Sequence, residues 1–479
     1  MNFGFITYIL GWILNFQSGF LFLTFVLSLF YGEKSGYALL VSAAISFLIG
    51  IICTWRKPKH KSFYAKDGFV AVALGWIVVS ISGALPFVIS GEIPSIFDAM
   101  FETISGYTTT GATILTNVEA MSKCLLFWRS FTHWIGGMGV LVFVMCILPL
   151  AGGNNMHLMR AESPGPSVGK LVPRVHSTAV ILYGIYSALT VIEVIFLLAG
   201  GMSMFDAITT SFGTAGTGGF GVRNDSIAGY STYIQNVVGV FMVLFGVNFS
   251  IYFLALVRKP KEILHSDELK SYIGIIIAST LIIGFNIRGY FPTLGKAIQQ
   301  AFFQVGSIMT TTGFSTTDFN KWPSLSKGIL VALMFVGACA GSTGGGIKVS
   351  RVVMAFKNIK NEIASFVHPK SIHTLRMEGK IVKNDVVRSV NTYLVLYFLV
   401  FAVSVLLISI ENFSLETSFT SVAATLNNIG PGLDLVGPMD NFAKFNPFSK
   451  CVFMFDMLAG RLELIPMIIL FSPWVWKRK

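Results

Sequence analysis

The stretch Thr310-Thr311-Thr312-Gly313-Phe314-Ser315 lies between two apolar runs, and it occurs again, earlier in the chain, as Thr108-Thr109-Thr110-Gly111-Ala112-Thr113. Two looser copies are Thr217-Gly218-Gly219-Phe220 and Asn428-Ile429-Gly430-Pro431. The anchoring glycines Gly111, Gly219, Gly313 and Gly430 are separated by 108, 94 and 117 residues. Such self-similarity at a long period predicts a repeated structural unit around each copy.

The composition is typical of a membrane protein. Of the 479 residues 53% are apolar and 12% are charged, and the mean hydropathy is +0.70, whereas a soluble domain carries about 25% charged residues. The net charge of +12 would favour nucleic acid as the partner of a soluble protein. In a polytopic protein the same excess is expected in cytoplasmic loops, so no nucleic-acid partner is predicted.

Neither the cysteines nor the N-terminus indicates a secreted protein. The five cysteines lack paired spacing, which predicts neither a disulfide framework nor a metal site. No Lys or Arg precedes Lys34, and the first apolar run continues to Phe30. This run is too long for a cleaved signal peptide, so we expect a retained spanning helix.

Ten apolar runs are long enough to span a bilayer, which takes about 20 helical residues. They cover residues 3–30, 37–54, 68–90, 125–150, 177–200, 233–257, 272–288, 325–350, 386–410 and 449–471. After the first pair, each pair brackets one glycine-centred stretch and one run that is too short to span. The short runs cover residues 96–107, 203–214, 294–308 and 414–426. The sequence therefore predicts an all-α polytopic membrane protein, with four helix–pore-helix–helix repeats around one central pore and two extra N-terminal transmembrane helices.

The four units share an internal register. Asp98-Ala99 and Asp206-Ala207 begin 13 residues before their anchor glycines, and Gln300-Ala301 holds the same place in the third unit. The fourth unit departs most, with Thr417-Ser418 at that place. Six residues before each anchor stands a small residue, namely Ser105, Gly213, Ser307 or Ala424. We expect an N-terminal helix pair with a basic loop at 1–66 and four pore repeats at 67–175, 176–270, 271–384 and 385–479.

The basic residues predict the orientation in the membrane. Of the 35 Lys and Arg residues, 22 fall within 55–66, 151–175, 258–270, 351–383 and 477–479. By the positive-inside rule these segments and both termini are cytoplasmic. All four glycine-centred stretches are then on the outer side.

The glycine-centred stretches have the chemistry of a cation path. A half-helix that ends near mid-membrane leaves carbonyls unpaired, and their partial negative charge favours a cation beyond its end. Extended backbone that follows can replace a hydration shell with further carbonyls where it lines a water-filled path, and glycine permits the dihedral angles this requires. The stretches carry no fixed charge, which favours a monovalent over a divalent cation. The candidate ion-binding residues are Thr109, Thr110, Gly111, Ala112, Thr217, Gly218, Gly219, Phe220, Thr311, Thr312, Gly313, Phe314, Asn428, Ile429, Gly430 and Pro431.

These motifs resemble the Trk/Ktr/HKT potassium transporter superfamily. The resemblance covers residues 68–479, and the extra N-terminal pair is similar to its TrkH branch. It implies that the candidate residues form one potassium selectivity filter within one polypeptide, and that glycine at every anchor makes it select potassium. Each unit has one shared glycine where a tetrameric potassium channel filter has two, which favours looser selectivity over sodium.

A glycine run interrupts the predicted second helix of the third unit, as Gly341-Ser342-Thr343-Gly344-Gly345-Gly346, and Lys348 follows it. A packing kink would explain a break, but three consecutive glycines cost about 1 kcal/mol each in a helix relative to alanine. The run resembles the family's intramembrane loop, which implies a gate below the filter.

Arg461 lies halfway along the last predicted helix, where a charge must be paired or face water. Glu463 and Asp456 are possible structural partners, although neither has the helical i+3 or i+4 spacing. The alternative, which the resemblance implies, is that Arg461 donates to the carbonyls of the glycine run and repels cations in the closed state. The residues alone leave both interpretations open.

Two further features concern packing and partners. His133 and Trp134 precede Gly136-Gly137-Met138-Gly139, which we interpret as a tight helix crossing with a hydrogen-bonded histidine. The segment 351–383 is either a solvated amphipathic stretch or a docking surface. The resemblance implies a TrkA-like cytoplasmic nucleotide-binding regulatory ring, a homodimer and surrounding lipid in a bacterial inner membrane. Potassium is expected as the substrate, with no tightly bound cofactor.

Three other functions are alternatives to a gated potassium channel. A membrane-embedded enzyme would need a nucleophilic or metal motif, and none of the HExxH, GxSxG or paired-cysteine patterns occurs. A secondary transporter of an organic substrate would have two inverted repeats, whereas these four units run in the same direction. Coupling of potassium to sodium or protons stays open against a gated channel.

Overall fold

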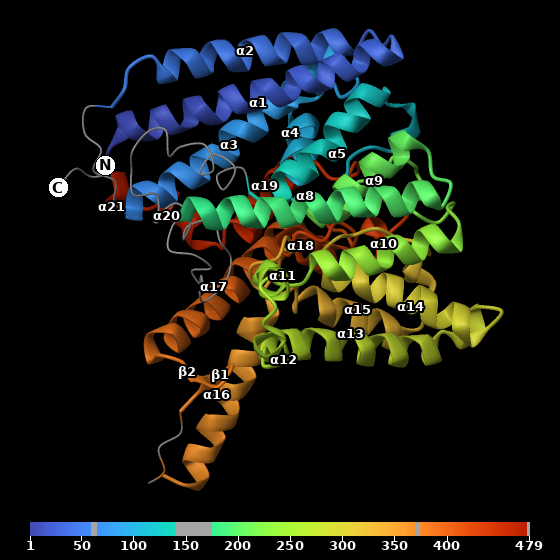
Figure 1. Ribbon diagram of the computed structural model, residues 1–479, viewed down its shortest axis with the longest axis vertical. Coiled ribbons are helices and arrows are strands. Elements are labelled where there is room, and N and C mark those ends of the chain that lie inside the picture. The colour runs from blue at the N-terminus through green and yellow to red at the C-terminus, as the bar shows by residue number, and fades with distance from the viewer. Residues whose placement is uncertain (59–64, 140–174, 370, 372–373, 477–479) are drawn as a thin grey trace.

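The fold is a bundle of long helices around a centre of shorter ones (Figure 1). The computed structural model describes residues 1–58, 65–139, 175–369, 371 and 374–476. Within these residues the chain is predominantly helical, and its one sheet is the antiparallel hairpin of β1 (Arg376–Met377) and β2 (Lys380–Ile381). The predicted all-α polytopic fold is confirmed.

The N-terminal helices α1 (Phe3–Tyr31) and α2 (Gly36–Thr54) pack against each other and against the first unit. Gln17 Nε2 donates to Val79 O at 2.9 Å, and Ser46 Oγ lies 2.5 Å from Ser82 Oγ. The pair is therefore attached to one side of the bundle by polar contacts between apolar helices.

Four units follow, each with the same order of elements. The first helices are α3 (Ala65–Ser90), α8 (Val175–Ala199), α13 (Asp267–Asn286) and α17 (Asn384–Ile408). The short helices are α4 (Ile96–Tyr107), α9 (Met204–Gly216), α14 (Leu294–Met309) and α18 (Leu415–Leu426). The second helices are α5 (Lys123–Gly137), α10 (Thr232–Phe245) with α11 (Phe249–Leu256), α15 (Ser324–Met334) with α16 (Val349–Val367), and α19 (Pro447–Arg461) with α20 (Ile465–Leu470). Connecting elements are α12 (Pro260–Leu264), α21 (Pro473–Trp476), η1 (Val118–Ala120), η3 (Arg288–Tyr290), η4 (Phe319–Lys321), η5 (Ser409–Glu411) and η6 (Asp434–Val436).

Each short helix begins at a hydroxyl cap. The side-chain oxygens of Ser95, Ser203, Thr293 and Ser414 accept the backbone N–H three residues later, at 3.4, 3.1, 3.2 and 3.1 Å. Such a cap satisfies one of the unpaired amides of the first turn. Three caps precede their anchor glycine by 16 residues, and Thr293 precedes Gly313 by 20. The third short helix is thus longer by about one turn at its N-terminus.

The ten apolar runs do not all form single continuous helices. Six of the described helices are long and apolar enough to cross a membrane, or seven if the bent pair α10 and α11 counts as one. These are the N-terminal pair and the first helix of every unit. The runs 233–257, 325–350 and 449–471 are each broken, and α10 and α11 meet at 90°. In the run 125–150, α5 ends at Gly137, and residues 140–150 lie outside the described part.

The break in the second unit has a tertiary cause. Cys339 N donates to Gly246 O at 3.0 Å, and Phe249 N donates to Gly341 O at 3.0 Å. Asn248 Oδ1 caps the new helix by accepting from Ser250 N at 2.9 Å. Backbone groups that a straight helix would pair internally are therefore paired with the glycine run of the third unit, which keeps the break satisfied at membrane depth.

The segment predicted as a cytoplasmic loop at 351–383 has structure of its own. Helix α16 runs through its first half and extends away from the bundle, and the hairpin connects it to α17 (Figure 1). Lys357 Nζ forms a 2.7 Å ion pair with Asp267 Oδ2, which also accepts from Glu378 N at 3.1 Å. The hairpin is thereby attached to the start of α13.

Candidate ion-conducting site

Four glycine-centred segments follow the short helices, and each continues from a Schellman motif. We name them segment 1 (Thr109–Ala112), segment 2 (Thr217–Phe220), segment 3 (Thr311–Phe314) and segment 4 (Asn428–Pro431). In segment 1, Thr109 N donates to Gly106 O at 3.1 Å and Thr110 N to Ser105 O at 2.9 Å. The other three segments repeat both bonds. The small residue six places before each anchor thus supplies the carbonyl that ends the helix.

Every second residue of these segments has a left-handed backbone. The first residues Thr109, Thr217, Thr311 and Asn428 have φ of 53° to 59°, and the anchors Gly111, Gly219, Gly313 and Gly430 have φ of 76° to 96°. The residue between them has a negative φ in each segment. Alternation of sign turns successive carbonyls toward the same side of the chain. Non-glycine residues at positive φ cost about 1–2 kcal/mol each, and four equivalent ones mark a functional constraint.

The four segments form a closed ring. An added Cβ would lie 2.0 Å from Gly218 O at Gly111, 2.1 Å from Thr312 O at Gly219, 2.1 Å from Ile429 O at Gly313, and 2.8 Å from Thr110 O at Gly430. Each anchor therefore faces the carbonyl that precedes the anchor of the next segment, in the order 1, 2, 3, 4 and back to 1. Only glycine leaves room for this approach.

A cavity of about 140 Å³ opens onto one end of the ring. Seven candidate residues line it, namely Gly111, Ala112, Gly219, Phe220, Gly313, Gly430 and Pro431. The other nine candidates lie buried behind or below them. We call this cavity the mouth. It receives residues from all four units, so the structure brings the sixteen candidates to one place.

Below segment 3 lies the glycine loop, residues 335–348, between α15 and α16. Gly345 N donates to Thr311 Oγ1 at 2.6 Å, so the loop touches the segment directly. An added Cβ would lie 3.0 Å from Thr310 O at Gly344 and 2.6 Å from Asn427 O at Gly345. The glycines are thus required for contact with the backbone above, which a simple kink would not need.

Two cations hold this loop. Lys348 Nζ donates to Gly344 O and, at 3.1 Å, to Gly345 O. Arg461 Nη1 donates to Thr343 O at 2.6 Å. Arg461 Nη2 donates to Gly136 O at 2.5 Å and Gly137 O at 2.9 Å, which joins the loop to the end of α5.

The alternative partners of Arg461 are engaged elsewhere. Glu463 forms a 2.6 Å ion pair with Arg351, and Asp456 Oδ1 accepts from Ser404 Oγ at 2.7 Å. Of the two arrangements left open by the sequence, the structure places Arg461 against the loop carbonyls. Among the described residues, no group of three or more His, Cys, Asp or Glu side chains is arranged to hold a metal ion.

Comparisons with known proteins show the family to which the chain belongs. The family profile described as TrkH, cation transport protein, matches residues 36–280 and 290–477. The chain belongs to the TrkH family. It is similar to the Trk system potassium uptake proteins TrkH of Salmonella typhimurium and Escherichia coli, each 37% identical over 487 aligned residues and 100% of both chains. The crystal structure of the potassium transporter TrkH from Vibrio parahaemolyticus matches with a TM-score of 0.89 and 34% identity, covering 100% of both chains.

In this TrkH-family chain, sequence reasoning missed residues that support the segments. His133, interpreted as a packing residue, contacts segment 2 as well as α4: its Nδ1 lies 2.8 Å from Gly106 O, and its Nε2 accepts from Phe220 N at 3.2 Å. The buried pair of Glu102 and Arg129 lies beside it. The sequence did contain a signal for Arg129, which lies inside the apolar run 125–150. A charged residue in such a run is rare and indicates a functional role.

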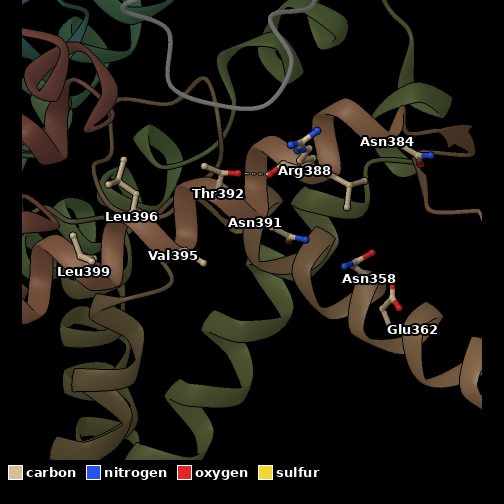
Figure 2. A pocket seen from close by; sticks show the side chains of 10 residues that line it. Asn358, Glu362, Asn384, Arg388, Asn391, Thr392, Val395, Leu396 and Leu399 are labelled. Atoms are coloured by element: carbon tan, nitrogen blue, oxygen red, sulfur yellow. Dashed lines mark hydrogen bonds between the residues drawn. The ribbon is translucent and has the colours of Figure 1, made fainter. Parts of the chain in front are cut away.

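The TrkH-family chain also has a groove on its surface, between α16 and α17 (Figure 2). Its volume is about 770 Å³. Figure 2 shows the amide of Asn391 turned toward Asn358 of α16, and the apolar Val395 and Leu399 farther along α17. The groove therefore changes from polar to apolar along its length.

Proposed function

We propose that this chain mediates potassium uptake across the cytoplasmic membrane through a single gated pore. Its TrkH-family relatives are named potassium uptake proteins, which is the name of a transporter and not of an enzyme. The observation that carries the proposal is the closed ring, in which four glycine anchors each face the carbonyl of the next segment. A ring of backbone carbonyls without a charged side chain suits a monovalent cation that must bind and leave again.

The approach to the ring favours cations. Four short helices end at the four segments, so the negative ends of their dipoles surround the proposed filter. The filter is proposed to comprise all sixteen candidate residues, with the carbonyls as ligands. Thr109 Oγ1 is buried and has no partner among the described residues, which makes it a further oxygen for an ion at the inner end.

The glycine loop with Lys348 and Arg461 is proposed as the gate. It lies below segment 3, and both side chains donate to its carbonyls. In this position the loop and two positive charges oppose the passage of a cation. Opening requires the loop to leave Thr311 and Arg461 together.

We also propose the partners that the family resemblance implies. Phe356, Ile359, Ile363 and Phe366 are exposed along α16 at helical spacing and form one apolar stripe. This stripe and the adjacent groove suit a second copy of the chain (Figure 2). The basic residues of 351–383 suit a TrkA-like nucleotide-binding ring on the cytoplasmic side.

The experiment that tests the filter is substitution of its anchors. Gly111→Ser and Gly313→Ser are expected to lower the potassium-to-sodium permeability ratio about tenfold or more, because the new Cβ would force the next carbonyl away. The measurement is the reversal potential of the purified protein in a planar bilayer, under opposed potassium and sodium gradients. A reversal potential that moves with pH at fixed potassium and sodium concentrations indicates coupling to protons in place of a channel.

The matched control is Gly201→Ser. Gly201 also has a left-handed φ, of 82°, but an added Cβ there meets no atom within 4 Å. The control therefore reproduces the backbone strain away from the ring, and its permeability ratio should equal that of the unmodified protein. If both anchor variants keep the original ratio, these glycines do not belong to a selectivity filter.

A further inference from the structure

Segment 2 lacks a side-chain contact that supports segments 1 and 3. In segments 1 and 3, hydroxyls two residues apart bond to each other, Thr108 to Thr110 at 2.8 Å and Thr310 to Thr312 at 2.7 Å. Segment 2 has glycine at both corresponding positions, 216 and 218. Glycine supplies no side-chain bond and has the largest conformational freedom. Something outside the segment must hold its carbonyls in place.

His133 of α5 provides one such contact. Its partners fix the neutral tautomer, because Nδ1 must donate to Gly106 O at 2.8 Å and Nε2 must accept from Phe220 N at 3.2 Å. One imidazole therefore joins the end of the first short helix to segment 2. An added Cβ at Gly218 would lie 2.3 Å from His133 Nδ1. Gly218 thus makes room for the histidine that supports its own segment.

Arg129, one helical turn before His133, provides the second contact. Its Nη1 donates to Gly221 O at 3.0 Å, and its guanidinium carbon lies 3.5 Å from the centroid of the Phe220 ring. The imidazole of His133 lies 4.1 Å from the same centroid. The Phe220 ring therefore contacts two side chains of the neighbouring unit, and the same two side chains bond to the N–H of Phe220 and the carbonyl of Gly221.

Glu102 completes the arrangement on the side of segment 1. Its Oε1 forms a 2.5 Å ion pair with Arg129 Nε, and its Oε2 accepts from Ile114 N at 3.0 Å. Thr113 Oγ1 also donates to this carboxylate, at 2.9 Å. Both charged side chains are buried, at 1% and 3% exposure. The ion pair thus connects the residues that follow segment 1 to those that follow segment 2.

The corresponding positions of the other units hold different residues. Arg129 and His133 stand 7 and 11 residues after the helix cap Ser122. The same counts from the caps of α10, α15 and α19 give the apolar residues Val238, Leu330 and Phe453, and then Met242, Met334 and Met457. At these aligned positions only unit 1 has the polar pair, and this pair adjoins the segment with glycine at positions 216 and 218.

We infer that Glu102, Arg129 and His133 are positioning residues that hold segment 2 against segment 1 and thereby set the potassium selectivity of the ring. They act on the carbonyl of Gly218, which faces Gly111, through the backbone of Phe220 and Gly221. This inference rests on the proposed function of the ring as a filter. It predicts that selectivity depends on side chains that never touch the ion.

The test uses His133→Met, which installs the residue of the other three units, and Arg129→Gln. Each is expected to lower the potassium-to-sodium permeability ratio about 3- to 10-fold, the effect of losing one or two hydrogen bonds. The control is Arg223→Gln. Arg223 also lines the mouth, but its guanidinium lies over Tyr230 at 4.0 Å and 3.8 Å from Asp206. The Arg223→Gln variant removes one positive charge from the mouth, as Arg129→Gln does, but releases no segment. It should therefore keep the potassium-to-sodium permeability ratio.

A second readout does not require flux. The potassium concentration that half-maximally raises the thermal unfolding midpoint in detergent should shift to higher values in both variants, and the midpoint without potassium should change less. If Arg129→Gln does not fold, the nearly isosteric Glu102→Gln is measured in its place, with the same expected losses.

The outcomes separate the two proposals. Unchanged ratios and unchanged potassium dependence in His133→Met and Arg129→Gln, with a lowered ratio in Gly313→Ser, would overturn the positioning role and leave the filter in place. Unchanged ratios in all of these variants, Gly313→Ser included, would overturn the filter itself. A lowered ratio in Arg223→Gln equal to that of Arg129→Gln would assign the effect to charge alone and overturn positioning.

Discussion

Asp440 is the one carboxylate among the described residues that line the mouth. The two arginines there, Arg129 and Arg223, face the carboxylates of Glu102 and Asp206. Burial raises the pKa of the Asp440 carboxyl above its ordinary value, Lys444 lowers it, and Asp318 raises it further. We therefore predict that Asp440 attracts potassium at neutral pH, and that it loses its charge at a higher pH than an isolated carboxyl would.

This raised pKa predicts the direction of the pH dependence. As the outer pH falls toward and through the raised pKa, Asp440 becomes neutral and potassium flux at low ionic strength should fall about two- to threefold. Asp440→Asn should show the lower flux at neutral pH and lack this step. The measurement is rubidium uptake into proteoliposomes against outer pH, with Asp225→Asn, outside the mouth, as the control. An identical step in Asp440→Asn would assign it to another group.

At the scale of an element, one side chain holds the backbone on both sides of the glycine run 341–346. Glu268 Oε1, at the start of α13, accepts from Ala340 N at 2.7 Å and from Ser350 N at 3.1 Å. The carbonyls within the glycine run accept hydrogen bonds from Lys348 and Arg461. The residues that flank the glycine run are thus held by a carboxylate, and the carbonyls within the run are held by two cations. Removing a cation should therefore free the run while its flanks stay in place.

We therefore predict that loss of the contacts within the glycine run opens the pore. Deleting Gly344 to Gly346, or Arg461→Ala, should raise potassium flux without a regulatory partner, with little change in selectivity because the segments keep their glycines. The rise for Arg461→Ala should be about tenfold or more, since hydrogen bonds from a charged donor contribute about 1.5–3 kcal/mol. Arg461→Lys should lie between, because it keeps the charge and loses the fork that reaches two units.

The assay is potassium uptake by purified protein in liposomes. Arg388→Ala is the control, since Arg388 is an exposed arginine that lines the surface groove. Reduced flux in all three loop variants, with the protein still folded, would mean that the loop is a structural brace.

At the scale of the whole molecule, the start of α1 and the end of α21 lie at one side of the bundle (Figure 1). The ring of Phe3 stacks on that of Trp476, with centroids 6.3 Å apart. A chain that crosses the membrane an even number of times has its first and last helices beginning and ending on the same side, as seen here. The side itself is a prediction from the basic residues, which place both ends in the cytoplasm.

Cysteine labelling tests that orientation. In a variant without the five native cysteines, Thr116→Cys near the mouth should react with an impermeant thiol reagent added outside intact cells. Lys360→Cys on α16 should react only after the cells are opened. Both side chains are exposed, so accessibility and not burial decides the result. The reverse pattern would overturn the orientation.

The sequence by itself determined what is local. The Schellman bonds that end the short helices join residues three and five positions apart, so the small residue and the glycine recur at fixed spacing and can be counted. The same holds for the serine and threonine caps, which sequence reasoning did not use although the spacing of 16 residues was present. Long apolar first helices were equally readable, because length and hydropathy alone decide them.

Only the tertiary structure decided what depends on another unit. The break between α10 and α11 is satisfied by amides and carbonyls of the glycine loop, roughly a hundred residues away. His133 was undecidable for the same reason: its local sequence fits a helix crossing, and its contact with Phe220 exists only when units 1 and 2 meet. The spacing of residues along the sequence predicts the hydrogen bonds within one unit. The partners across units are chosen by packing, which no spacing in one segment encodes.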